Sequence, residues 1–268
     1  MIYDLQKASI LKRMSAFLLD FILLVIAITG FAVLIFNITD IVSNRDSYNE
    51  VLTEYENKFS SNDWNMKINL SRQVFTIDGK EYTFVDLSEE QKEFITVVYD
   101  TVEHDNRFIY NSQMMFNKAL IIVSLSLFLS IFLLEFIIPL IFKNGQTVGK
   151  KIFSIAVMRV DGVRMDPVVL FTRSILGKFT IETMIPAFLI LMHLFNVGTL
   201  VTLAVLILIP IFQLILVIAT KTNSLIHDII SSTVSVDLPS QMIFESVEAK
   251  KEYQLRIHDE ETKNSKYF

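Results

Sequence analysis

Three acidic residues lie inside long apolar stretches of this 268-residue chain. They are Asp20, Glu135 and Glu182. A charged side chain at the centre of a bilayer costs about 2.5–3.5 kcal/mol on insertion scales, so it must face protein or water, or take up a proton. Carboxylates in such places exchange protons or bind cations. The three acids are therefore candidates for ion or proton handling.

A proline follows two of these acids at the same spacing. Pro139 comes four residues after Glu135, and Pro186 comes four residues after Glu182. Because proline has no backbone N–H, the carbonyl four residues earlier in a helix loses its usual hydrogen bond. Each glutamate can thus combine a carboxylate with a free carbonyl at one kink, which suits a cation or a proton.

A purely structural role for the same acids is equally open. Arg13, Arg173 and Lys178 are expected near the same membrane depth as the acids. Long basic side chains can extend to reach carboxylates at that level. The acids would then pair with these cations and orient the helices. The sequence does not decide between an ion or proton site and a structural polar cluster.

Four apolar stretches must position these side chains. About 20 apolar residues in a helix match the roughly 30 Å hydrocarbon thickness of a bilayer, and a helix satisfies its own backbone hydrogen bonds there. The predicted spans are residues 17–36, 119–142, about 180–195, and 197–219. We expect an α-helical membrane protein with four transmembrane helices and both termini in the cytoplasm. A small extracytoplasmic α+β insertion lies between helices 1 and 2, and a short β element is cytoplasmic.

Charge between the spans sets this orientation. Residues 143–178 hold seven basic and two acidic residues, which favours the cytoplasmic side, and residues 37–118 are net acidic. The predicted segments are the cytoplasmic N-terminus with helix 1 (1–36), the extracytoplasmic domain (37–118), helix 2 (119–142), a cytoplasmic basic β-hairpin with an amphipathic helix (143–179), the hairpin of helices 3 and 4 (180–219), a closing segment with a strand (220–238), and a cytoplasmic tail (239–268).

The predicted outer domain combines helical and strand signals. Apolar residues recur at helical spacing from Tyr48 to Phe59, and Ser88 with Gln91 forms a capping-box pattern that starts a helix. Asp78-Gly79 between residues 74–77 and 82–85 predicts a β-hairpin. The domain is either a spacer or a unit that binds a ligand or partner.

The predicted inner segments contain a β element. Residues 155–160 read as a strand, Asp161-Gly162 as a turn, and residues 163–165 as a return strand. Asp166-Pro167 marks a helix start, and that helix either lies on the membrane surface or continues into the third span. Residues 233–238 alternate as a strand that can pair with the 155 region.

Several function classes find no support in the residues. The chain has no cysteine, and its four histidines lack metal-ligand spacing, so we expect no metal site. The formal net charge of −5 does not favour nucleic acid as a partner. No nucleophile–base constellation or cofactor motif is present, so we expect neither an enzyme nor a bound cofactor.

Three short segments carry a family resemblance. Residues 13–20 run Arg-Met-Ser-Ala-Phe-Leu-Leu-Asp, residues 144–150 run Asn-Gly-Gln-Thr-Val-Gly-Lys, and residues 227–236 begin His-Asp. Together they resemble the RDD family of bacterial membrane proteins, named for one arginine and two aspartates. Arg13, Asp20 and Asp228 match those positions. The other motif positions are Gly145, Gln146, Thr147, Gly149, Lys150, His227 and Thr233.

The resemblance implies a multi-pass protein of the bacterial cytoplasmic membrane. Transport is suggested for the family, and cation/proton antiport for some members. On that reading Arg13, Asp20, Glu135, Glu182 and Asp228 form the ion or proton site. The alternative is a non-enzymatic accessory or sensor that binds a partner through residues 37–118. Expected partners are the lipid bilayer and either further copies of the chain or another membrane protein.

Overall fold

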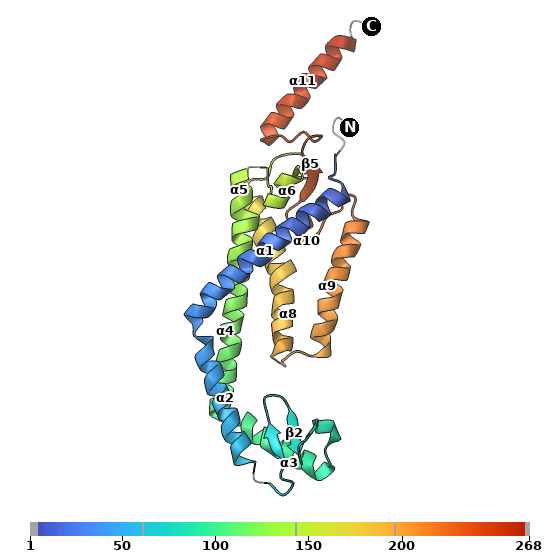
Figure 1. Ribbon diagram of the computed structural model, residues 1–268. Helices are drawn as coiled ribbons and strands as arrows, with labels where there is room; N and C mark the ends of the chain where they lie inside the picture. Colours follow the sequence, from blue (N-terminus) through green and yellow to red (C-terminus); the bar gives the residue numbers. More distant parts are fainter. Residues whose placement is uncertain (1–4, 61, 143, 196, 266–268) are drawn as a thin grey trace. The chain divides into compact units, whose positions relative to one another are not determined.

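A computed structural model describes residues 5–60, 62–142, 144–195 and 197–265 (Figure 1). The chain divides into two compact units. The core unit comprises Met1–Val33 and Val123–Phe268, and the insertion unit comprises Leu34–Ile122. Each unit is described by itself.

Four helical stretches are long and apolar enough to cross a membrane. The first is α1 (Ile10–Thr39), and the second joins α4 (Asn106–Ile131), η2 (Phe132–Ile137) and α5 (Ile138–Phe142). The third joins α7 (Pro167–Phe171), η3 (Thr172–Met184) and α8 (Ile185–Leu194), and the fourth is α9 (Leu200–Ala219). The four predicted spans are therefore present, and the first three are longer than their apolar stretches because polar turns continue the helices.

The third span begins well before residue 180. The helix that starts at Pro167 continues without a break to Leu194, which is the second of the two alternatives predicted for it. Its predicted start is confirmed: the Asp166 carboxylate accepts a hydrogen bond from the backbone N–H of Val169 (2.8 Å), and Pro167 follows this cap. Basic residues of that segment therefore lie on the same helix as Glu182.

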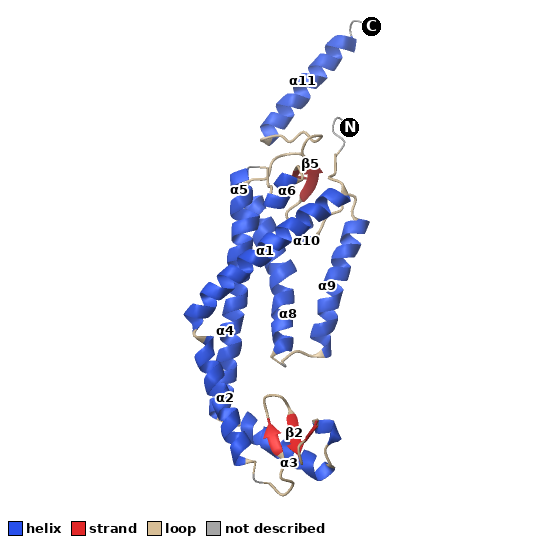
Figure 2. Ribbon diagram, viewed as in Figure 1, coloured by secondary structure: helices blue, strands red, loops and turns tan. Residues whose placement is uncertain are grey.

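The β element of the core unit is formed by two strands that are far apart in sequence. β4 (Ile155–Arg159) pairs antiparallel with β5 (Thr233–Asp237) over five residue pairs, as the alternation of residues 233–238 predicted (Figure 2). Ala156, Met158, Val234 and Val236 form its buried core. The short helices α6 (Val148–Ile152) and α10 (Ile226–Ile230) contact these strands, and α11 (Val247–Ser265) follows in the tail.

The predicted hairpin of residues 155–165 is confirmed in its first strand and its turn, where the Gly162 backbone N–H donates to the Arg159 carbonyl at 2.9 Å. Its return strand is wrong: residues 163–165 form no strand and are joined to β4 by one hydrogen bond, from the Arg159 N–H to the Val163 carbonyl, and by an isolated bridge between Met158 and Arg164. The Arg164 backbone N–H instead donates to the Phe244 carbonyl at 2.8 Å. The return segment thus pairs with the tail, where a parallel bridge joins Val163 to Phe244.

The insertion unit has its own small α+β core. It contains α2 (Ile41–Lys58), β1 (Lys67–Asn69), β2 (Val74–Ile77), β3 (Lys80–Tyr82), η1 (Phe84–Asp86) and α3 (Glu89–Glu103), with the strands in the order β1-β2-β3. Asp78 (φ 50°) and Gly79 (φ 77°) make the predicted turn, and the Ser88–Gln91 capping box is confirmed. The strand predicted at 82–85 ends early, because Thr83 and Asp86 cap a 3-10 turn instead.

Candidate functional site

A cavity of about 480 Å³ in the core unit collects most of the charged residues of the spans. Its volume falls within the range of small-molecule sites. α1, η2, η3, α9 and α10 all contribute side chains to its wall. The charged or titratable lining residues are Arg13, Asp20, Glu135, Lys150, Arg173, Lys178, Glu182, His227 and Asp228.

Asp20 binds the start of helix α6. Its Oδ1 accepts a hydrogen bond from the backbone N–H of Gly149 (2.7 Å), and its Oδ2 accepts one from the Thr147 hydroxyl (2.5 Å). A side chain at position 149 does not fit, because its Cβ would lie 2.3 Å from the Ala16 carbonyl oxygen. Asp20 therefore fastens α1 to the segment of residues 145–150.

The segment of residues 145–150 is a connector in which each motif residue has a contact. Gly145 has a φ of 59°, in the region that favours glycine. The Gln146 side chain donates to the Ile155 carbonyl at 2.8 Å, and the Thr147 hydroxyl accepts from the Lys150 backbone N–H at 3.3 Å. These bonds hold α6 between α1 and β4.

Asp228 is the centre of a buried ion-pair cluster. The Arg173 guanidinium donates to the Asp228 carboxylate and to the Thr233 hydroxyl, and the side chains of Arg173 and Asp228 are only 4% and 2% exposed. An Arg13 nitrogen lies 4.0 Å from the second Asp228 oxygen, and Arg13 also donates to the Asn223 carbonyl at 2.9 Å. Burial alone would raise the pKa of Asp228, but the Arg173 charge, with hydrogen bonds from Arg173 and the Leu225 backbone N–H, holds it well below its ordinary value.

Glu182 is paired with His227. The His227 backbone N–H donates to Glu182 Oε1 at 2.9 Å, and the ring Nδ1 lies 2.8 Å from Oε2. Gly177 permits this approach, because a Cβ there would lie 2.6 Å from the His227 Cβ. Burial, with the Arg173 charge nearby, lowers the pKa of His227. The neutral imidazole with Nδ1–H is therefore the form that donates to Glu182.

Glu135 is paired with Lys178 across two spans. The Lys178 ammonium contacts the Glu135 carboxylate directly. The Glu135 backbone carbonyl, which Pro139 deprives of its helical donor, accepts a hydrogen bond from the Ser174 hydroxyl at 2.7 Å. Both helices are π-helical here, in η2 and η3, with N–H groups bonding five residues back, as Ile138 bonds Leu133. Such segments are rare and often mark functional sites.

Lys150 is the exception among the charged lining residues. Within the part of the chain that the structure describes, its ammonium makes no hydrogen bond and no ion pair within 4 Å. Asp20 and Glu135 are close enough to influence it, as are the cations Arg173 and Lys178. Burial and then these two cations lower the pKa of Lys150 to about 7. The amine is therefore poised to change charge near neutral pH.

A comparison with known protein families matches the RDD family over residues 7–232. The chain belongs to the RDD family. No curated protein and no solved structure matches the chain. All three RDD positions line the 480 Å³ cavity. Arg13 and Asp228 lie 4.0 Å apart, and Asp20 binds the start of α6 through the Gly149 N–H. With four apolar helices, this is an RDD-family membrane protein.

Sequence reasoning identified the acids of this RDD site but not all of their partners. Pairing of the three span acids with Arg13, Arg173 and Lys178 was predicted as one alternative, and it is seen for Lys178 with Glu135. Arg13 and Arg173 lie at Asp228 instead. Sequence reasoning did not foresee that His227 pairs with Glu182, or that Lys150 lines the cavity. The spacing of Gly177 and Ser174 along η3 carried no signal, since their partners come from α10 and η2.

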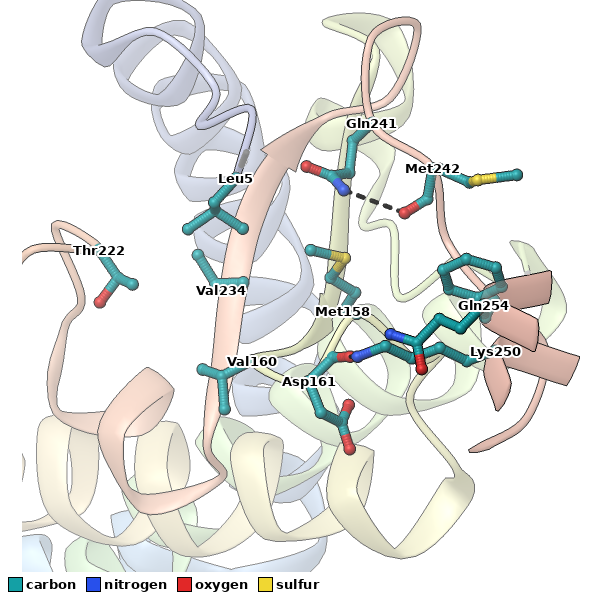
Figure 3. Close-up of a pocket in the computed structure, with 12 residues that line it drawn as sticks. Leu5, Met158, Val160, Asp161, Thr222, Val234, Gln241, Met242, Lys250 and Gln254 are labelled. Atoms are coloured by element: carbon teal, nitrogen blue, oxygen red, sulfur yellow. Dashed lines mark hydrogen bonds between the residues drawn. The ribbon is translucent and has the colours of Figure 1, made fainter. Parts of the chain in front are cut away.

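A second cavity, of about 290 Å³, lies at the β element (Figure 3). Met158 and Val234 of the two strands line it, and Lys250 of α11 donates to the Asp161 carbonyl beside it. It includes none of the residues predicted for the site. No group of three metal-ligating side chains occurs among the described residues.

Proposed function

We propose that this RDD-family protein is a secondary transporter that moves a small charged solute in exchange with protons, with the charged cavity as its binding site. The observation that carries the proposal is the gathering of four acids, four cations and a histidine from several spans around one cavity. Ionisable residues inside membrane segments are costly, and they commonly mark ion or proton pathways.

The paired charges suit reversible proton uptake. Glu135 with Lys178 and Glu182 with His227 each join elements distant in sequence. Protonation of Glu135 would remove the opposite charge that holds Lys178, and protonation of Glu182 would weaken its hydrogen bonds from His227. These changes would loosen the contact between η3 and η2 and the contact between Glu182 and α10. Arg13 and Arg173 on Asp228 then act as the clamp that keeps the closing segment in place.

We further propose that both termini are cytoplasmic and that the insertion unit is extracytoplasmic. The supporting observation is the short basic segment of residues 143–178 between the second and third spans. The lysine and arginine surplus of this segment favours the inner face of a bacterial cytoplasmic membrane. Four spans then return the C-terminus to the side of the N-terminus.

Self-association is part of the proposal. Only 6% of the apolar window of α1, and none of that of α9, is buried within the chain. Four helices form a small transporter, and these surfaces are available for lipid or for a second copy. Cross-linking in native membranes that yields only monomer would remove this part of the proposal.

Flux through reconstituted protein tests the transport proposal. Proteoliposomes with an imposed pH gradient should show solute-dependent proton movement with the unaltered chain and little with the Asp20→Asn, Glu135→Gln double variant. Glu89→Gln is the matched control, since Glu89 lies in the insertion unit, has a side chain that is 91% exposed, and pairs only with Lys92 among the residues described. Equal flux from all three proteins would exclude the proposed role of the acids.

The insertion unit supports a second candidate function, that of an accessory or sensor. Its surface exposes apolar side chains beside a buried core: Val85 is 80% exposed and Val97 is 56% exposed. Exposed apolar groups that gather in a patch mark partner-binding surfaces. Pull-down from native membranes distinguishes this function: a stoichiometric partner lost in a Val85→Asp variant supports it, and recovery of the chain alone opposes it.

A further inference from the structure

The cavity combines one unpaired cation with an apolar wall. Among the described residues, each of the other three cations lies within 4.0 Å of a carboxylate, whereas Lys150 contacts none. The two Asp20 oxygens are already occupied by Thr147 and Gly149. The half-buried Lys150 ammonium without an acceptor is unfavourable, and an anionic group beside it would relieve that cost.

The apolar wall of the cavity belongs to α1. Phe17, Phe21, Leu24 and Ile28 recur at helical spacing and line the cavity together with the charged residues. Phe17 is 66% exposed and Phe21 is 50% exposed. Because they both line the cavity and lie on the outer surface of a span, the rim of the cavity opens towards the hydrocarbon of the membrane. A ligand with an alkyl chain could therefore extend from the cavity along α1.

We propose that the cavity binds an anionic amphiphile, whose carboxylate or phosphate group lies at the Lys150 ammonium and whose alkyl chain lies on the Phe17–Ile28 wall of α1. This inference names the substrate class of the proposed transport site. Movement of the amphiphile across the membrane rests on the proposed transport function. Binding itself requires only the cavity. The head group is shared by free alkyl carboxylates and by anionic membrane lipids.

Photo-crosslinking in phosphatidylcholine nanodiscs tests the proposal on the full chain. One arm uses diazirine-bearing dodecanoate, a free amphiphile, and the other uses diazirine-bearing phosphatidylglycerol, a membrane lipid. The reporter is labelling of Ile131, which lines the cavity and is only 2% exposed, so that bulk lipid does not reach it. The arm that labels Ile131 identifies the source of the ligand.

Two neighbouring lysines provide a matched comparison. Lys150→Gln should reduce Ile131 labelling about tenfold, the loss expected for one charge-assisted contact. Lys151→Gln should leave it unchanged, because the Lys151 ammonium lies over the Phe142 ring, 3.6 Å from its centroid, and does not line the cavity. Lys150→Arg keeps the charge and should retain the labelling, which separates loss of charge from misfolding.

Three results would overturn the proposal. The first is equal labelling of Ile131 in Lys150→Gln and in the unaltered chain. The second is labelling by a diazirine-bearing alkyl trimethylammonium to the same extent as by dodecanoate, and the third is no labelling of Ile131 in either arm. Absence of flux in proteoliposomes alongside Lys150-dependent labelling would instead count against transport while leaving the binding site intact. The two proposals can thus fail separately.

Discussion

Gly149 lies where α1 and the start of α6 meet most closely. Replacing it with alanine should destabilise the protein by about 1–3 kcal/mol, the usual cost of overpacking, because the new Cβ would lie 2.3 Å from the Ala16 carbonyl. Gly30→Ala in α1, the helix that Gly149 contacts, is the control, since nothing lies within 4 Å of the Cβ position of Gly30. Thermal unfolding in detergent measures both. A Gly149→Ala midpoint equal to that of Gly30→Ala would refute the close approach.

Lys150 should make the stability of the folded chain rise with pH above neutrality. Its pKa is lowered to about 7 in the folded chain, so the unfolded chain binds one more proton between about pH 7 and the ordinary lysine pKa near 10.4. Stability therefore rises with pH in that window, and the penalty of the buried charge is fully present below it. The facing groups Asp20, Glu135, Arg173 and Lys178 set this pKa together with burial.

The measurement is the thermal midpoint from pH 6 to 10, compared between the unaltered chain and Lys150→Gln. Lys150→Gln should unfold at a higher temperature than the unaltered chain near pH 6, and this difference in thermal midpoint should shrink as the pH rises. Lys151→Gln, whose lysine lies outside the cavity, should show no such trend. A constant difference for Lys150→Gln across the range would mean that Lys150 keeps its ordinary protonation.

At the scale of elements, the Arg173–Asp228 ion pair helps to join η3 to the closing segment. Arg173→Ala leaves the Asp228 carboxylate buried with its main partner removed, so it should cost about 3–5 kcal/mol. Arg159→Ala, which breaks an exposed pair with Asp161, should cost about 0–1 kcal/mol. Denaturant titration in mild detergent compares the two variants. Similar losses from both would show that the Arg173 pair does not hold η3 to α10.

The elements themselves were largely predictable, for physical reasons that differ between them. The spans follow from apolar length, and the turn at Asp78-Gly79 and the cap at Ser88 follow from local chemistry. The return strand at 163–165 was wrong, although the turn before it forms, because this segment pairs with Phe244 of the tail, which is distant in sequence. Local turn signals do not report such distant pairing.

The site was predictable in its acids and not in its pairing. A carboxylate in an apolar stretch is visible in the sequence, as for Glu135 and Glu182. Which cation meets it depends on how η3 rotates and on where α10 packs, as the pairs with Lys178 and His227 show. Lys150 was taken only as a motif residue, because its lack of a partner is a property of the folded cavity.

At the scale of the whole molecule, the orientation can be tested with single cysteines, since the natural chain has none. Ser71→Cys in the insertion unit and Glu252→Cys in α11 both lie at exposed positions. In intact bacterial cells a membrane-impermeant maleimide should label Ser71→Cys, and it should label Glu252→Cys only after permeabilisation. Labelling of both positions in intact cells, or of Glu252→Cys alone, contradicts the proposed orientation.

The claim that the charged cavity is a transport site is tested most directly by access to the cavity from each side of the membrane. Thr183→Cys places one thiol in the cavity wall, and this measurement requires no knowledge of the solute. In oriented vesicles, an impermeant maleimide should label it from both faces, with the favoured face changing as the pH gradient is reversed. Labelling from one face only, unaffected by the gradient, would contradict alternating access and the transporter proposal.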